Sequence, residues 1–200
     1  MEHRDLIYHG LAIKRHAPAS VVADFLALPS SLVVSILDEA VTTGRAVKTG
    51  EAYALTALAR VALEGRYSLH FSMFRHDPAF VANYEEFERV NKRLKEVITS
   101  WQTIEVGGAV IANDHRDKDH DDRIINRLGA VHEEIDPVIS ALAIQFPRLR
   151  IYASRLLHAL EAAEDGDTEW VSGMQCESYH TVWFELHEDL LRIMGRARED

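Results

Sequence analysis

The sequence predicts a mainly helical protein with one small β-hairpin near its beginning, and three observations lead to this class. Apolar residues recur at intervals of three and four along most of the 200 residues. Only ten Gly and five Pro interrupt them, too few for a loop-dominated or fibrous chain. The hairpin is expected in RAVKTGEAYALT, residues 45–56, where two short strand-like runs flank a turn at Lys48-Thr49-Gly50-Glu51.

The composition excludes two further classes of protein. With 47% hydrophobic and 27% charged residues, the chain is able to bury a core, so disorder is not its main state. No apolar run approaches the roughly 20 residues that a membrane-spanning helix needs. The beginning, MEHRDLIYHG, lacks the pattern of a secretory signal, and the single Cys176 cannot build a disulfide framework. We therefore expect a cytoplasmic protein.

The charges are distributed unevenly along the chain. Lys and Arg number 22 and Asp and Glu number 32, a net charge of -10 that matches nucleic acid poorly as a whole. Residues 1–66 hold seven bases and seven acids, so residues 67–200 carry the entire deficit. This change of balance predicts two modules with different partners, one over 1–66 and one over 67–200.

The first module is expected to contain four helices around the hairpin. Short helices are predicted over 6–13 and 20–26. A third follows Pro29, with Ser30 or Ser31 as its N-cap and Gly44 at its end. After the hairpin, Thr56 is expected to cap a fourth helix that continues toward Gly65.

This order of elements is that of a winged helix-turn-helix. The stretch VVADFLALPSSLVVSILDEAVTTGRAVKTGEAYALTALARVAL resembles the DNA-binding half of bacterial transcriptional regulators of the MarR and GntR kind. The resemblance implies that the third helix enters the major groove, while the hairpin wing contacts phosphates. The DNA-binding residues that it implies are Ser30, Ser31, Ser35, Arg45 and Lys48.

One departure from those regulators bears on DNA binding. Their third helix usually presents Arg, Lys, Asn or Gln to base edges, whereas this one presents serines and is followed by Asp38 and Glu39. Few cations also mean few neutralised phosphates, so a monomer is expected to bind DNA weakly and a dimer more strongly. The alternative is a winged helix that contacts protein or serves as scaffold.

The second module is predicted to be an antiparallel helical bundle. A long amphipathic helix spans 78–102, after Asp77 as N-cap. Residues 103–122 are expected to be an irregular polar loop. Further helices are predicted over 122–135, over 148–163 and over about 177–197, and Pro137 is expected to start or kink the segment PVISALAIQF between the first two.

The polar loop gathers oxygen and imidazole groups. Asp117, Asp119 and Asp121 have the spacing of a calcium loop, but Asp122 and Leu128 replace the Gly and Glu that an EF-hand needs, so that interpretation fails. What remains is either a site for a divalent ion or a hydrated loop with helix-capping acids; the groups are Asn113, Asp114, His115, Asp117, Asp119, His120, Asp121 and Asp122.

The last helix carries two histidines on a largely apolar surface. His180 and His187 are seven residues apart, about 10 Å along a helix, so one ion cannot easily bind both. Partners from other helices would complete a site, and we name His132, Asp136 and His180 as the candidate metal ligands. The candidate ligand-binding residues are Trp101, Asn113, Asp114, His115, His180, Trp183 and His187. Alternatively, hydrogen bonds inside the bundle satisfy these histidines.

Two more resemblances concern the second module. LEAAEDGDTEWVSGMQCESYH resembles the end of the helical effector domains of FadR-type regulators, many of which bind a metal through three His and one Asp. Those domains place Asp four residues before His, whereas His132 precedes Asp136 here. Trp101-Gln102, Asn113-Asp114-His115 and YHTVWFELHEDLL resemble segments of bacterial proteins associated with phosphoenolpyruvate-utilising dikinases.

The sequence contains no glycine-rich phosphate loop, no G-x-S-x-G elbow and no H-E-x-x-H motif, so we do not expect an enzyme. We expect a homodimeric transcriptional regulator whose bundle senses a small-molecule effector or dimerises. The alternative is a protein-interaction module with a degenerate winged helix, associated with a phosphoenolpyruvate-utilising enzyme.

Overall fold

The computed structural model describes residues 1–198 and confirms a mainly helical protein with a small antiparallel sheet. Helices take up 72% of the chain and strands 9%. Tertiary contacts divide the chain into two compact units. We call residues 1–77 together with those from His187 onward the N-terminal unit, and Pro78–Leu186 the helical unit.

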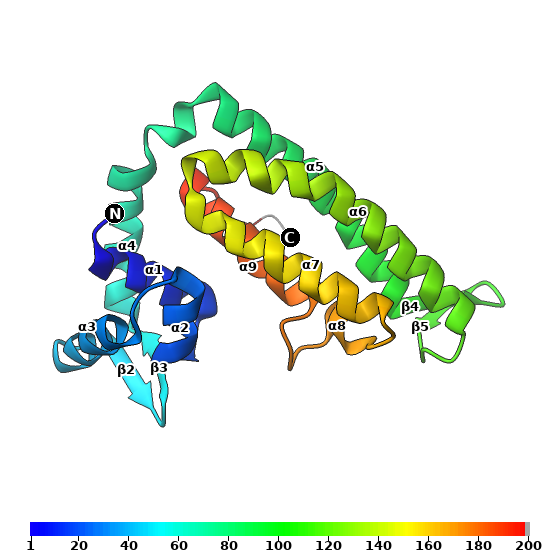
Figure 1. Cartoon of the computed structure of the whole chain (residues 1–200), viewed down its shortest axis with the longest axis horizontal. Helices are drawn as coiled ribbons and strands as arrows, with labels where there is room; N and C mark the ends of the chain where they lie inside the picture. Colours follow the sequence, from blue (N-terminus) through cyan, green and yellow to red (C-terminus); the bar gives the residue numbers. More distant parts are fainter. Residues whose placement is uncertain (199–200) are drawn as a thin grey trace. The chain divides into compact units, whose positions relative to one another are not determined.

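The N-terminal unit alternates helices with short strands (Figure 1). Its elements are α1 (His3–Lys14), β1 (Ala17–Pro18), α2 (Ala19–Leu26), α3 (Ser30–Thr42), β2 (Ala46–Thr49), β3 (Ala52–Leu55), α4 (Ala57–Phe71) and the 3-10 helix η1 (Phe74–His76). The three strands form an antiparallel sheet in the order β1-β3-β2. Ala17 pairs with Tyr53 across one edge of β3, and Ala46 pairs with Leu55 across the other.

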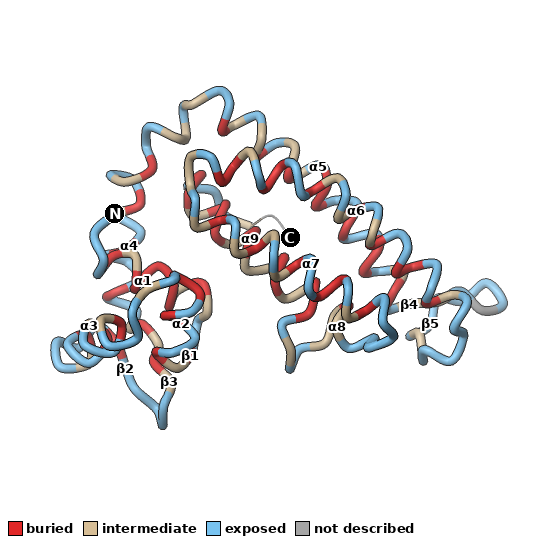
Figure 2. Tube along the Cα trace, viewed as in Figure 1, coloured by how far each residue is buried: buried red, intermediate tan, exposed pale blue. Residues whose placement is uncertain are grey.

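The inner faces of these helices form one core. Each of these helices has a buried side (Figure 2). Ile7 and Leu11 of α1 and Leu37 of α3 are fully buried, and Tyr53 and Leu55 of β3 are nearly so. The alternation of buried and less buried residues in β3 follows from the two-residue period of a strand. Packing against this core fixes α3 while its opposite side remains exposed.

Several local predictions for this unit are confirmed and others are wrong. Thr56 caps α4 by accepting a hydrogen bond from the amide of Ala59, and Gly44 follows α3 with a positive φ of 69°. The N-cap of α3 is Pro29, with no side-chain cap, because Ser30 is already the first helical residue. The fourth helix does not stop at Gly65 but continues to Phe71, because Leu63, Tyr67 and Phe71 keep one face of it buried.

The helical unit consists mainly of long helices. Its elements are α5 (Pro78–Gln102), β4 (Thr103–Val106), β5 (Ala109–Ala112), α6 (Lys118–Gln145), the 3-10 helix η2 (Pro147–Leu149), α7 (Arg150–Glu164), the short α8 (Glu169–Ser172) and the first half of α9 (Tyr179–Met194). α5 packs along α6, and α6 along α7 (Figure 1). α5 begins and ends where the sequence predicts.

Two predictions for the helical unit are wrong. Residues 103–122 contain a hairpin, in which β4 and β5 pair around Gly107 and Gly108, both with positive φ. A Gly-Gly turn supplies these dihedral angles without steric cost, and the G-G pair between apolar runs was the missed signal. Pro137 does not start a new helix, as one of the two predicted alternatives had it, since α6 runs through it. Because proline has no N–H, the carbonyl of Glu133, four residues earlier, loses its helical hydrogen bond. Glu133 is exposed, so water can reach this carbonyl.

α9 is shared by the two units, because the contacts of Tyr179–Leu186 belong to the helical unit and those from His187 to the N-terminal unit. Within residues 1–198, no helix combines the length and the apolar character needed to cross a bilayer.

Candidate nucleic-acid interface and ligand sites

The outward side of α3 is the surface that a winged helix would present to DNA. Ser30, Ser31 and Ser35 are all exposed there, and Val34 beside them is 39% exposed. Asp38 and Glu39, one turn further on, are exposed as well. The serine hydroxyls can form hydrogen bonds with DNA but discriminate weakly between bases, and the two carboxylates repel phosphate.

Lys48 at the wing is not an isolated cation. Its ammonium lies 3.6 Å from a carboxylate oxygen of Asp38 and 4.6 Å from the centre of the Tyr53 ring. The Tyr53 hydroxyl donates a hydrogen bond of 2.7 Å to the same carboxylate. The hydrogen bond with Tyr53 and the charge of Asp38 raise the pKa of Lys48 above its ordinary value. The wing lysine is therefore charged, but Asp38 on α3 already balances that charge.

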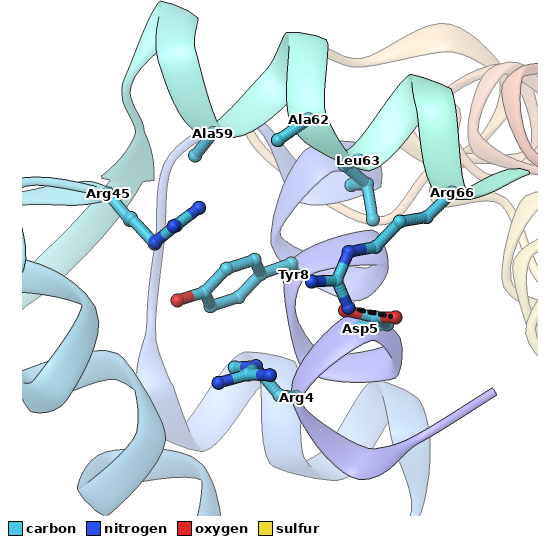
Figure 3. A pocket seen from close by; sticks show the side chains of 8 residues that line it. All are labelled: Arg4, Asp5, Tyr8, Arg45, Ala59, Ala62, Leu63 and Arg66. Carbon is cyan, nitrogen blue, oxygen red and sulfur yellow. Dashed lines mark hydrogen bonds and ion pairs between the residues drawn. The ribbon is translucent and has the colours of Figure 1, made fainter.

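Arg45, which directly precedes β2, lines a pocket together with residues of α1 and α4 (Figure 3). The pocket has a volume of about 80 Å³, and its lining is Arg4, Asp5, Tyr8, Arg45, Ala59, Ala62, Leu63 and Arg66. Figure 3 shows the guanidinium groups of Arg4 and Arg45 on two sides of the Tyr8 ring. Three arginines thus gather in a small space.

Asp5 compensates one of the three arginines. Its two carboxylate oxygens each lie 2.8 Å from the same guanidinium nitrogen of Arg66, and His70 Nε2 lies 3.1 Å away. Burial raises the pKa of Asp5, but the hydrogen bonds from Arg66 and His70 outweigh it, so the pKa lies below its ordinary value. The same ion pair raises the pKa of Arg66.

A second pocket of the N-terminal unit is larger, about 420 Å³, and mixed in charge. Residues of α1, β3, α4 and the end of α9 line it. Its charged members are Arg15, Arg60, Glu64, Glu188 and Arg192, and Glu188 pairs with Arg192 at 3.5 Å.

The predicted ligand cluster near the polar loop is a compact structural contact. The Asn113 amide donates to the carbonyl of Trp101 and to the carboxylate of Asp121, each at 3.0 Å. His115 pairs with Asp121 at 3.1 Å and packs on the buried Trp101 ring at 4.5 Å between centroids. Asp114 instead points outward, 66% exposed, and pairs with Arg116. Three of the four predicted residues therefore join the end of α5 to the start of α6.

The acids of this segment include a helix cap. Asp117 precedes α6 and accepts a hydrogen bond of 3.0 Å from the amide of His120. This contact favours the interpretation of the loop as one with helix-capping acids.

The remaining predicted ligand residues lie along α9. Trp183 is buried, donates a hydrogen bond of 2.9 Å to Asn91, and stacks on Phe87 at 5.3 Å. His180 is half-buried, and His187 is 5% exposed and belongs to the N-terminal unit. The structure thus divides the two histidines between the units.

The candidate metal ligands do not come together as a set. His132 lies 3.3 Å from the Tyr179 hydroxyl, and burial lowers the pKa of its imidazole despite the nearby Asp136. Asp136 itself is exposed. In the part of the chain that the structure describes, no three His, Cys, Asp or Glu side chains form a group suited to a metal ion, and His132, Asp136 and His180 are no exception.

Sequence reasoning did not single out Arg4, Tyr8 or Arg66, which line the pocket with Arg45. A signal was present, because Arg4 and Tyr8 are four residues apart and so share one face of α1. Nothing in the sequence placed α4 and Arg45 against that face.

Comparison with known proteins finds no matching family model, no matching curated protein and no matching solved structure.

Proposed function

We propose that the N-terminal unit is a winged helix-turn-helix that binds DNA, and that the chain is a transcriptional regulator whose helical unit senses a small molecule or dimerises. The observation that carries the proposal is the order α1-β1-α2-α3-β2-β3-α4 with the strand order β1-β3-β2. In proteins of this architecture the third helix is the one that enters the major groove. The exposed side of α3 supports the same role.

The charges around α3 indicate how such binding would work. The helix itself carries no Lys or Arg, and Lys48 is balanced by Asp38. Serine contacts discriminate weakly between bases, so affinity must come from phosphates and is low for one protomer. A homodimer, which doubles the contacts, is therefore part of the proposal. α4 exposes Leu58, Val61 and Leu69 on one face, an apolar surface that a second copy would cover.

Fluorescence anisotropy tests the proposal. The chain is titrated into a labelled duplex of ~21 base pairs, which is two helical turns, at salt concentrations from about 50 to 200 mM. Binding that weakens steeply with salt is expected. Asp38→Asn keeps an acceptor for the Tyr53 hydroxyl but releases Lys48, so it should raise the affinity. It should also steepen the slope of log K against log salt by about 0.9 per protomer. Sedimentation equilibrium on the same samples gives the number of protomers bound.

Asp114→Asn is the matched control, because Asp114 is also an exposed aspartate beside a cation but lies in the helical unit. It should leave both the affinity and the salt slope unchanged. Absence of binding at low salt by both the native chain and Asp38→Asn would overturn the proposal.

A second function is favoured by the acidic end of α3. Exposed Asp38 and Glu39, with Lys48 neutralised, suit contact with a basic protein surface better than contact with phosphates. The sequence resemblance suggests a phosphoenolpyruvate-utilising dikinase as partner. For this function, the native chain should not bind DNA, and its cosedimentation with such an enzyme should disappear when Asp38 and Glu39 are both changed to Lys. Persistence of cosedimentation after these changes would remove α3 from the contact.

A further inference from the structure

We propose that Arg4, Arg45 and Tyr8 form a binding site for a phosphoryl dianion, either free phosphate or the phosphate of a monoester. The site is distinct from the outward side of α3 and does not depend on DNA binding. It lies in the small pocket between α1 and α4 (Figure 3).

The side chains around the pocket come from separate parts of the N-terminal unit. Arg4 and Tyr8 are one turn apart on α1, Arg45 follows the end of α3, and α4 closes the pocket with Ala59, Ala62 and Leu63. A volume of about 80 Å³ has room for a single tetrahedral oxyanion.

The donors of the pocket are not used by the rest of the protein. Within residues 1–198, the side chains of Arg4 and Arg45 and the Tyr8 hydroxyl make no hydrogen bond or ion pair. Arg66, by contrast, is held by Asp5. Two guanidinium groups that face one phenol without a counter-ion repel each other, and an anion between them would remove that repulsion.

The protonation state of Tyr8 fits an anion acceptor. Tyr8 is only 7% exposed, and burial raises its pKa, although Arg45 and Arg4 oppose that rise. Its hydroxyl is therefore a neutral donor at physiological pH and can donate to an oxyanion. A phenolate would instead repel an incoming anion.

The charge of the donors selects a dianion over a monoanion. With Arg66 balanced by Asp5, Arg4 and Arg45 supply two positive charges that no ion pair within residues 1–198 neutralises, and the more distant charge of Glu39 also acts on Tyr8. A carboxylate would neutralise only one of them, whereas a phosphate monoester carries about -1.5 to -2 near pH 7. Guanidinium forks match phosphate oxygens in a bidentate manner, and the apolar wall of α4 strengthens such contacts by excluding water.

An occupied pocket would also fix the junction between α3 and the wing. The Arg45 amide donates to the Ala40 carbonyl at the end of α3. The Arg45 carbonyl accepts from the amide of Thr56, at 2.9 Å, and from its hydroxyl, at 3.1 Å. A ligand held by the Arg45 side chain is therefore attached to the residue that directly precedes β2 and that bonds back to the last turn of α3. Phosphoryl binding at this point would limit how the wing moves against α3.

Titration of the full chain with inorganic phosphate, followed through the Nε–H NMR signals of the arginines, tests the site. The signals of Arg4 and Arg45 should shift and saturate, as they should with glycerol 2-phosphate. Acetate and chloride at equal ionic strength should leave them in place. Binding should strengthen as the pH rises through the second phosphate pKa, about 6 for an ester, because the dianion is the ligand.

Variants connect the shifts to the pocket. Arg4→Ala and Arg45→Ala should each weaken phosphate binding at least tenfold, about 1.4 kcal/mol, and Tyr8→Phe should weaken it less. Arg60→Ala is the matched control, since Arg60 is an exposed arginine of α4 at the larger pocket. It should bind phosphate as the native chain does. The two pocket arginines are exposed, so their variants should fold, and circular dichroism verifies this.

The source of the phosphoryl group is read from separate titrations. If free phosphate and glycerol 2-phosphate shift the arginine signals, the ligand is a small molecule, whether or not the chain binds DNA. If only a duplex shifts the Arg4 and Arg45 signals, and Arg45→Ala removes the shift, the arginines contact the singly charged phosphodiesters of DNA and the proposal of a dianion site is overturned. If none of these ligands gives saturable shifts, or if the shifts survive both arginine substitutions, the site does not exist.

Discussion

Single residues decide how α9 ends. Gly195 follows the helix with a φ of +67°, and a Cβ at this position would lie 2.6 Å from the guanidinium carbon of Arg75. Arg75 is itself fixed there, because it donates to the carbonyls of Ile193, at 2.8 Å, and Arg192, at 3.2 Å. The arginine thus satisfies carbonyls that the helix cannot pair internally, and only glycine leaves it room.

Gly195→Ala should therefore lower the free energy of unfolding by about 1–3 kcal/mol, since it combines a strained φ with a steric clash. Gly65→Ala is the matched control. Gly65 lies inside α4 and is exposed, and among residues 1–198 nothing beyond its own stretch of helix lies within 4 Å of the place a Cβ would take. Alanine there should stabilise the chain by about 0.5–1 kcal/mol. Urea unfolding of both variants measures the difference, and equal effects of the two substitutions would contradict the role given to Arg75.

At the scale of elements, α1 and α4 are joined by a charged contact as well as by their core. Asp5 on α1 binds Arg66 and His70, which lie four residues apart on α4. The carboxyl is nearly buried, and its pKa in the folded protein lies below the ordinary 3.8. Ionised Asp5 therefore binds protons less readily in the folded chain than in the unfolded one.

This contact should contribute stability that is fully present above the ordinary pKa of 3.8 and is lost as the pH falls through the lower folded-state pKa. Asp5→Asn should destabilise the protein at neutral pH, and its deficit relative to the native chain should shrink in that acidic window. Thermal unfolding from neutral pH downward measures the deficit. A deficit that is the same at every pH would show that packing, and not the charge, is what the substitution removes.

The elements of the helical unit show where sequence patterns suffice. α5 was predicted over its full length because its apolar residues repeat at three and four and Pro78 marks its start. The pairing of β4 with β5 was missed because two four-residue strands give little periodicity. The unbroken α6 was missed because packing of Ile135, Val138 and Ile139 on either side of Pro137 outweighs the local cost of proline.

At the scale of the whole molecule, the end of the chain returns to its beginning. His9 of α1 and Asp189 of α9 are both completely buried and lie 3.1 Å apart, and the other ring nitrogen of His9 lies 2.9 Å from the Tyr67 hydroxyl of α4. Three elements from distant parts of the sequence thus meet in one buried polar contact. Its cost is recovered only while both partners are in place.

Asp189→Ala should accordingly destabilise the N-terminal unit by about 1–3 kcal/mol, because it leaves the buried His9 ring nitrogen without its partner. Asp114→Ala removes a carboxylate from an exposed pair with Arg116 and should change stability by less than about 1 kcal/mol. Hydrogen exchange of the α1 and α4 amides locates the effect. Unchanged protection of α1 in Asp189→Ala would contradict a role for this pair in holding the unit together.

The sequence by itself determined the helical class, the hairpin over 45–56, the long α5 and the exposed serines of α3, because each depends on the spacing of neighbouring residues. Only the tertiary structure decided that Arg4, Tyr8 and Arg45 share a pocket, that Asp38 holds Lys48, and that Asp189 reaches His9. It also showed that Trp183 bonds to Asn91 and that Asn113 bonds to Trp101 and Asp121. These arrangements join positions far apart in the chain, and a local pattern carries no information about which distant side chains a folded core brings together.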